Sequence, residues 1–120
     1  MSSPARLLLP MILAVAALAQ STGPIRVGGN VQSANLIKKV APAYPASMKA
    51  LRMEATVLLN VTISKEGVPE AISVASTEVD HDFTDAAVEA VKEWRYRPTL
   101  LNGQPVEVIT TVQINFTLAQ

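Results

Sequence analysis

The stretch Asp82-Phe-Thr-Asp-Ala-Ala-Val-Glu-Ala-Val-Lys-Glu-Trp-Arg-Tyr-Arg-Pro98 has the strongest periodic pattern in the chain. Its apolar residues recur at the i, i+3, i+4 and i+7 spacing of one helix face. These residues are Phe83, Ala86, Ala87, Ala90, Val91 and Trp94. Asp82 is expected to cap the first turn, and Pro98 prevents the helix from continuing. Because an apolar stripe needs a cover, the pattern predicts a helix that lies on a sheet, with Trp94 as its large anchor.

Alternating residues predict the strands of that sheet. Ala55–Ile63 and Val108–Leu118 place apolar side chains at every second position, the pattern of a strand with one buried face. A shorter strand is expected over Ala71–Ser76, after a turn in which Gly67 can take a positive φ. Ala46–Arg52 is expected to form a short helix before the first strand.

The order of these elements predicts an α+β fold. The first two strands form an antiparallel hairpin, and a right-handed crossover through the second helix brings the third strand back beside the first. The prediction is a three-stranded antiparallel/mixed sheet in the order 2-1-3, with two helices on one face. This order leaves the last strand at an edge of the sheet.

The N-terminal residues have the pattern of an export signal. Arg6 precedes the apolar run Leu7–Leu18, which is too short to span a membrane, and Ala17-Leu18-Ala19 is typical of a cleavage site. We expect residues 1–19 to be a signal peptide cleaved after Ala19, 20–35 a flexible lead-in, and 36–120 one domain. The expected location is the periplasm, or the inner membrane as an anchored protein if the segment is retained.

The residue inventory argues against catalysis. The chain has ten basic and ten acidic residues, so it lacks the basic surface that nucleic-acid binding needs. It has one histidine, His81, no cysteine and no G-x-S-x-G motif. Asp80-His81-Asp82 is interpreted as an acidic helix start, where the helix dipole favours carboxylates. The sequence therefore predicts a protein that is not an enzyme and uses no cofactor or metal.

The last strand is the candidate binding surface, since an edge strand carries unpaired N–H and C=O groups. Its outward residues bear no charge: they are Ile109, Thr111, Gln113, Asn115 and Thr117. Three alternatives are open. A partner peptide adds as a strand, two copies pair into a homodimer, or the Leu36–Val40 arm covers the edge.

Several motifs together resemble the TonB C-terminal domain. They are Pro42-x-Tyr44-Pro45, Gly67-x-Pro69, Ala86-x-x-Ala-Val91-x-x-Trp94-x-Tyr96-x-Pro98, Asn102-Gly103-x-Pro105-Val106 and Ile114-x-Phe116-x-Leu118. The resemblance covers residues 36 to 118. It implies a periplasmic module that binds a short extended peptide, the TonB box of an outer-membrane transporter, by strand addition to its last strand. The hypothesis for this chain is a stand-alone domain of that kind.

The resemblance also implies roles for single residues. The arm Ala41, Pro42, Tyr44 and Pro45 is expected to contact the peptide, whereas Trp94, Tyr96 and Pro98 are expected to be structural. The family has a glutamine where this chain has Ala41, so recognition is expected to rely on backbone pairing. The implied function is a part in TonB-type energy transduction and transmembrane transport. In the full-length members of the family an inner-membrane motor complex drives the transport. The alternative for this chain is a structural or self-associating periplasmic domain without coupling to that motor.

Overall fold

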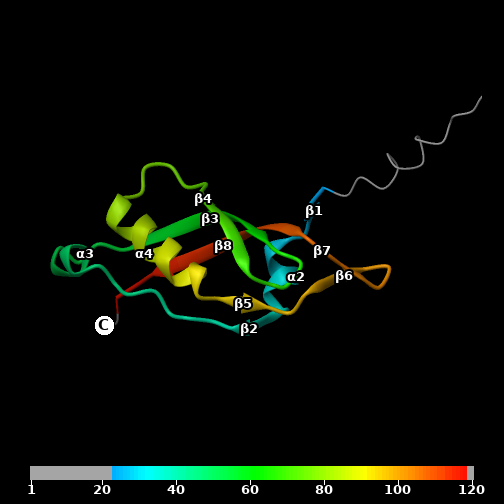
Figure 1. Ribbon diagram of the computed structural model, residues 1–120. Helices are drawn as coiled ribbons and strands as arrows, with labels where there is room; N and C mark the ends of the chain where they lie inside the picture. Colours follow the sequence, from blue (N-terminus) through cyan, green and yellow to red (C-terminus); the bar gives the residue numbers. More distant parts are fainter. Residues whose placement is uncertain (1–22, 119–120) are drawn as a thin grey trace, which may run out of the picture.

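The computed structural model describes residues 23–118, so the predicted signal peptide lies outside the described residues. The fold is α+β (Figure 1). In chain order its elements are β1 (Ile25–Arg26), α2 (Gly29–Ser33), β2 (Leu36–Lys38), α3 (Ala46–Ala50), β3 (Ala55–Ile63), β4 (Pro69–Val74), α4 (His81–Lys92), β5 (Arg95–Tyr96), β6 (Thr99–Leu101), β7 (Gln104–Val106) and β8 (Val108–Phe116). None of the helices within 23–118 is long and apolar enough to cross a membrane.

The main sheet has four strands in the order β1-β8-β3-β4. The three predicted strands are neighbours in the predicted order, with β3 antiparallel to both β4 and β8. The prediction of a three-stranded sheet was wrong because a fourth strand, β1, pairs parallel with the start of β8, at Val108 and Ile109. This pairing adds a strand to the side of β8 that was expected to be free.

Helix α4 crosses one face of the sheet and closes the core (Figure 1). Its apolar stripe packs on the alternate residues of β3 and β8, and Phe83, Val91 and Leu59 are almost completely buried. The helix is capped by Asp80, whose Oδ1 accepts a 2.8 Å hydrogen bond from the backbone N–H of Asp82. The prediction of Asp82 as the cap was therefore wrong by two residues.

The other two helices do not lie where the sequence suggested. The short α3, predicted on the same face as α4, lies at the end of the sheet beside the first turn of α4 (Figure 1). Its Ser47 hydroxyl donates a 2.7 Å hydrogen bond to Asp82 Oδ2, and its Met48 is buried in the core. The third helix, α2, was not predicted and packs against β8.

The chain after α4 is held by a second, small sheet. Helix α4 ends at Lys92 because the following residues pair with β2, with Leu36 opposite Tyr96. The carbonyl of Gly67 accepts a 2.9 Å hydrogen bond from Tyr96 N–H. Gly67 has the predicted positive φ, 89°, and a Cβ there would lie 1.9 Å from the Tyr96 carbonyl oxygen. No other residue fits this close approach.

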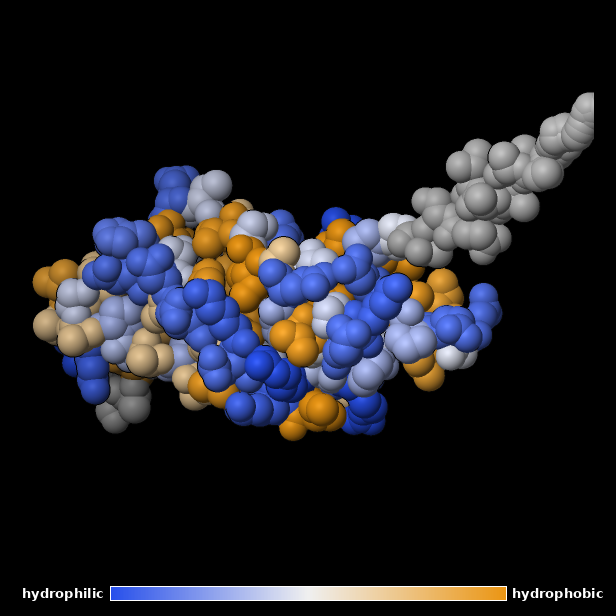
Figure 2. Space-filling model, in the orientation of Figure 1, coloured by the Kyte–Doolittle hydropathy of each residue, from blue (hydrophilic) through white to orange (hydrophobic). Residues whose placement is uncertain are grey.

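The predicted lead-in contains ordered elements, since β1 and α2 both fall within it. The prediction of a flexible segment over 20–35 is therefore wrong for 25–33. The Leu36–Val40 arm pairs with β5 instead of covering β8, which corrects the third alternative for the edge. Beyond β5, β6 and β7 form a hairpin around Asn102 and Gly103, both with positive φ. On the face shown in Figure 2, hydrophobic residues are interspersed with hydrophilic ones.

Candidate functional site

The candidate site is the edge of β8 that faces away from β3. Backbone groups of successive residues in a strand point to opposite sides. The Ile109 carbonyl accepts a 2.9 Å hydrogen bond from the N–H of Val27, on the β1 side. By the same alternation, Thr111, Gln113 and Asn115 direct their N–H and C=O groups to that side. Past β1 and α2, no strand within the described residues pairs with this side of β8. We call the backbone of Gln113 and Asn115 on this side the open edge.

The side chains of Thr111, Gln113 and Asn115 lie on the solvent face of the sheet and are neutral. Thr111 Oγ1 donates a 3.4 Å hydrogen bond to Asn60 on β3, and Asn115 Oδ1 accepts a 3.0 Å bond from Thr56. Gln113 Nε2 donates to the same Asn115 oxygen over 3.3 Å. These bonds tie Thr111 and Asn115 to β3 and Gln113 to Asn115, so the backbone is the part of β8 that is available for pairing.

A groove of about 580 Å³ runs beside this strand and is named here the β8 groove. Its walls are Thr110–Gln113 of β8 and the residues of α2. Leu36 and Lys39 of the Leu36–Val40 arm also line it. Trp94 and Tyr96 also line it, with 3% and 2% of their surfaces exposed. An extended segment that paired with the open edge would therefore have an adjoining groove for its side chains.

The Pro-x-Tyr-Pro arm lies beside the end of β8. The Tyr44 ring stands edge-on to Phe83 and Phe116, with ring centroids 5.8 and 5.7 Å apart. Its hydroxyl donates a hydrogen bond to the Met53 carbonyl. Pro42 and Pro45 are half-buried, whereas Ala41 is exposed. Tyr44 thus anchors the arm next to the last residue of β8.

The predicted structural residues divide into two groups. Trp94 is buried, and its indole N–H donates a 2.8 Å hydrogen bond to the Val40 carbonyl. This bond ties the Leu36–Val40 arm to the end of α4. The Lys39 ammonium lies 5.5 Å from the Trp94 ring centroid. Tyr96 is buried in the core, whereas Pro98 is exposed between β5 and β6. Trp94 and Tyr96 serve both the core and the wall of the groove.

Burial raises the pKa of the Tyr96 phenol from 10.0 to about 12. The unfolded chain loses this proton near the ordinary value, whereas the folded chain keeps it. The stability that depends on the neutral phenol is therefore complete below the unfolded pKa and is lost as the pH rises through the folded pKa. We expect Tyr96→Phe to lose less stability than the wild type between about pH 9 and about pH 11.5. The urea midpoint of unfolding of each protein, measured at both pH values, gives this loss of stability. An equal loss in Tyr96→Phe and in the wild type would contradict the prediction.

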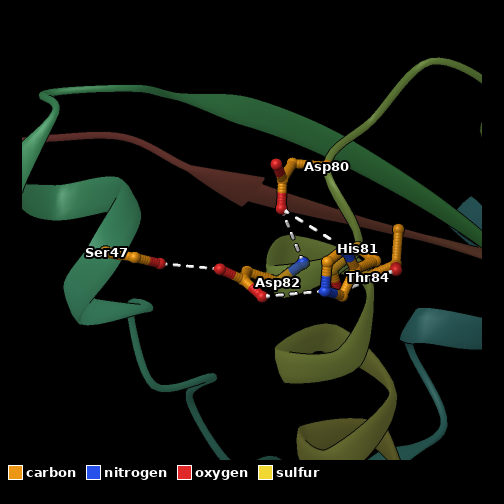
Figure 3. Close-up of polar contacts among 5 residues, drawn as sticks. All are labelled: Ser47, Asp80, His81, Asp82 and Thr84. Atoms are coloured by element: carbon orange, nitrogen blue, oxygen red, sulfur yellow. Dashed lines mark hydrogen bonds and ion pairs between the residues drawn. The ribbon is translucent and has the colours of Figure 1, made fainter.

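The acidic helix start is drawn in Figure 3, where three neighbouring residues point toward one another. His81 Nε2 lies 3.3 Å from Asp82 Oδ1, and His81 Nδ1 lies 3.9 Å from Asp80 Oδ1. Asp80 caps α4, Asp82 accepts the bond from Ser47, and Thr84 donates to the His81 carbonyl over 3.1 Å. All three residues are accounted for by the start of α4 and its link to α3.

The structure brings part of the predicted site together. Thr111, Gln113 and Asn115 lie along one edge, and the arm lies beside its far end. Ile109 is covered by β1, and Thr117 lies beyond the end of β8. The α2 residues and Lys39 were missed. Gly28-Gly29 was the only signal for α2, and it indicates a backbone that approaches another chain segment as readily as it indicates a loop.

A family model described as Gram-negative bacterial TonB protein C-terminal matches residues 40–118. The chain is 33% identical over 86 residues to protein tonB2 of Pseudomonas aeruginosa, covering 72% of this chain and 32% of that protein. It is 31% identical over 74 residues to protein TonB of Klebsiella pneumoniae, covering 62% of this chain and 29% of that protein. The chain thus spans about a third of the length of these curated relatives.

Two solved structures share the fold. The solution NMR structure of the Pseudomonas aeruginosa TonB CTD aligns with a TM-score of 0.62 at 24% identity, covering 71% of this chain and 86% of that one. The tonb2 protein from Vibrio anguillarum aligns with a TM-score of 0.57 at 28% identity, covering 84% and 96% of the two chains.

Proposed function

This chain belongs to the family of Gram-negative bacterial TonB protein C-terminal domains, and we propose that it is a periplasmic module that binds an extended segment of a partner protein. The segment adds as a strand to the open edge of β8, and its side chains enter the β8 groove. The proposal assigns binding to the site and no catalytic step.

One observation carries this proposal. The backbone of Gln113 and Asn115 points away from β3 and has no strand beside it in the described part of the chain. A sheet edge of this kind offers an N–H and a C=O at every second residue, which an extended peptide can pair with. The neighbouring groove has apolar and polar walls that suit alternate side chains of such a peptide.

The proposed partner is the TonB box of an outer-membrane transporter, and the proposed role is a part in TonB-type energy transduction. Family membership and the similarity to the TonB proteins support this partner. The proposed location is the periplasm, reached through cleavage after Ala19, with attachment to the inner membrane if the N-terminal segment is retained.

Binding is tested by titrating isotope-labelled protein with synthetic TonB-box peptides and following its backbone amide signals. We expect the amides of Gln113 and Asn115 to shift and to become protected from exchange with solvent, since each gains a hydrogen-bond partner. Shifts confined to α3 or to the β6–β7 hairpin would place the binding surface elsewhere and contradict strand addition.

A second candidate function uses the same edge. Because Thr111, Gln113 and Asn115 carry no charge to oppose edge-to-edge contact, two copies can pair through β8. Sedimentation across a concentration series separates the two candidates. A peptide-binding module is expected to stay monomeric and a self-associating domain to become dimeric as concentration rises. Loss of the dimer on addition of a TonB-box peptide would show that both use one surface.

A further inference from the structure

The first described elements of the chain occupy half of the edge at which a partner is proposed to bind. β1 lies parallel to β8, and the N–H groups of Ile25 and Val27 donate to the carbonyls of Glu107 and Ile109 over 3.0 and 2.9 Å. Helix α2 follows directly and lies so close to β8 that only a glycine fits at position 29. We call residues 25–33 the cover, because they lie where a longer added strand would have to lie.

The cover consists of two short elements. β1 has two residues, and α2 has five, with Gly28 at its N-cap and no side-chain capping bond. An isolated helix of this length has little stability of its own. The cover therefore depends on its contacts with β8 and the groove.

One of those contacts is unfavourable. The Gln32 side chain is 1% exposed, and within residues 23–118 neither its amide nitrogen nor its amide oxygen has a hydrogen-bond partner. The buried Thr110 hydroxyl on β8 also has no partner in this range. Both residues line the β8 groove. Burying unpaired polar groups opposes docking, because water satisfies the same groups when the helix is released.

We propose that the cover is a built-in occupant of the β8 edge, which the partner strand displaces when it binds. This inference rests on the proposed function and adds a competition within the chain: binding exchanges β1 and α2 for the partner segment, which takes the place of α2 beside the remaining groove residues Leu36, Trp94 and Tyr96. The cover precedes residues 40–118, the region that the family model matches. Partner affinity is therefore set both by the partner and by how firmly the cover is held.

Two substitutions move the competition in opposite directions. In Gly29→Ala the new Cβ would lie 2.5 Å from the Thr111 carbonyl oxygen, a backbone atom that cannot yield, so α2 is expected to leave β8. Alanine favours a helix more than glycine does, so release would not reflect a weaker helix. In Gln32→Leu the unpaired buried amide is replaced by an apolar group, so the cover is expected to be held more tightly.

Gly23→Ala is the matched control, since a Cβ at position 23 meets nothing within 4 Å. The first measurement is amide exchange at Val27 and Gln32 in the free full-length protein. We expect exchange to be faster in Gly29→Ala and slower in Gln32→Leu than in the control. The second is the affinity of each variant for a synthetic TonB-box peptide. We expect roughly tenfold tighter binding by Gly29→Ala and roughly tenfold weaker binding by Gln32→Leu.

The outcomes separate the inference from the function on which it rests. Equal affinities in all variants, with exchange at Val27 altered as expected, would mean that the cover does not compete; the inference would be wrong and the proposed function would stand. Failure of every variant to bind the peptide would overturn the proposed function and the inference with it. Affinities that change in opposite directions in the two variants support the competition, because a general loss of folding would weaken both.

Discussion

Trp94→Ala is expected to remove a large share of the stability of the domain. Trp94 is 3% exposed within the core, and its indole N–H bonds the Val40 carbonyl. Truncation of a buried tryptophan costs ~3–5 kcal/mol, and the whole stability of a domain is about 5–15 kcal/mol. The substitution also removes the hydrogen bond that holds Val40, four residues before Tyr44. Chemical denaturation followed by circular dichroism measures the free energy of unfolding.

Two controls show which contact of Trp94 matters. Lys39→Ala removes only the cation above the ring, and we expect a loss of at most ~1 kcal/mol. Trp94→Phe keeps an aromatic ring but lacks the N–H that bonds Val40, so its loss is expected to fall between the two. If Trp94→Ala unfolded at the same denaturant concentration as Lys39→Ala, Trp94 would not be the anchor of the core.

Gln113→Pro is expected to weaken binding of the TonB-box peptide at least tenfold while the domain stays folded. Proline lacks the backbone N–H, and the N–H of Gln113 points to the open edge instead of to β3. The ladder between β3 and β8 therefore keeps its hydrogen bonds, and proline is tolerated on edge strands. Loss of the pairing at this position is expected to weaken binding at least tenfold. Isothermal calorimetry with the peptide measures the change.

The matched control is Gln113→Ala, which removes the side chain and keeps the N–H. We expect it to bind nearly as well as the wild type, because the Gln113 side chain bonds Asn115 on the same strand. A further variant, Val112→Pro, removes an N–H that faces β3 and is expected to unfold the sheet. Full binding by Gln113→Pro would mean that the partner does not add to β8.

The strands that alternate most regularly were the most predictable elements. β3 begins and ends at the predicted residues, and β8 ends at Phe116 instead of Leu118. In both strands one face is buried and the other is exposed to solvent. Apolar and polar residues therefore alternate along the sequence with the period of a strand. Gly67 was predictable for a similar reason, since its positive φ is a local property of one turn.

Features set by distant contacts were not predictable. The end of α4 depends on the pairing of Tyr96 with Leu36, and no local signal at Lys92 indicates it. β1 has two residues, too few for a periodic pattern. The same holds for the candidate site. The edge residues of β8 could be predicted from the alternation of its side chains. The cover and the groove could not, because they form where separate segments of the chain meet.

The central ladder of the sheet also bears on how the protein acquires its fold. β3 and β8 pair residues as distant in sequence as Ala55 and Phe116. Such long-range pairing makes folding slow, because the chain loses the entropy of closing a large loop before the stabilising contacts between the strands can form. A chain synthesised or exported from its N-terminus cannot complete this sheet until its last strand has emerged. If the chain is exported as proposed, the domain is therefore expected to cross the membrane as an open chain and to fold only after export.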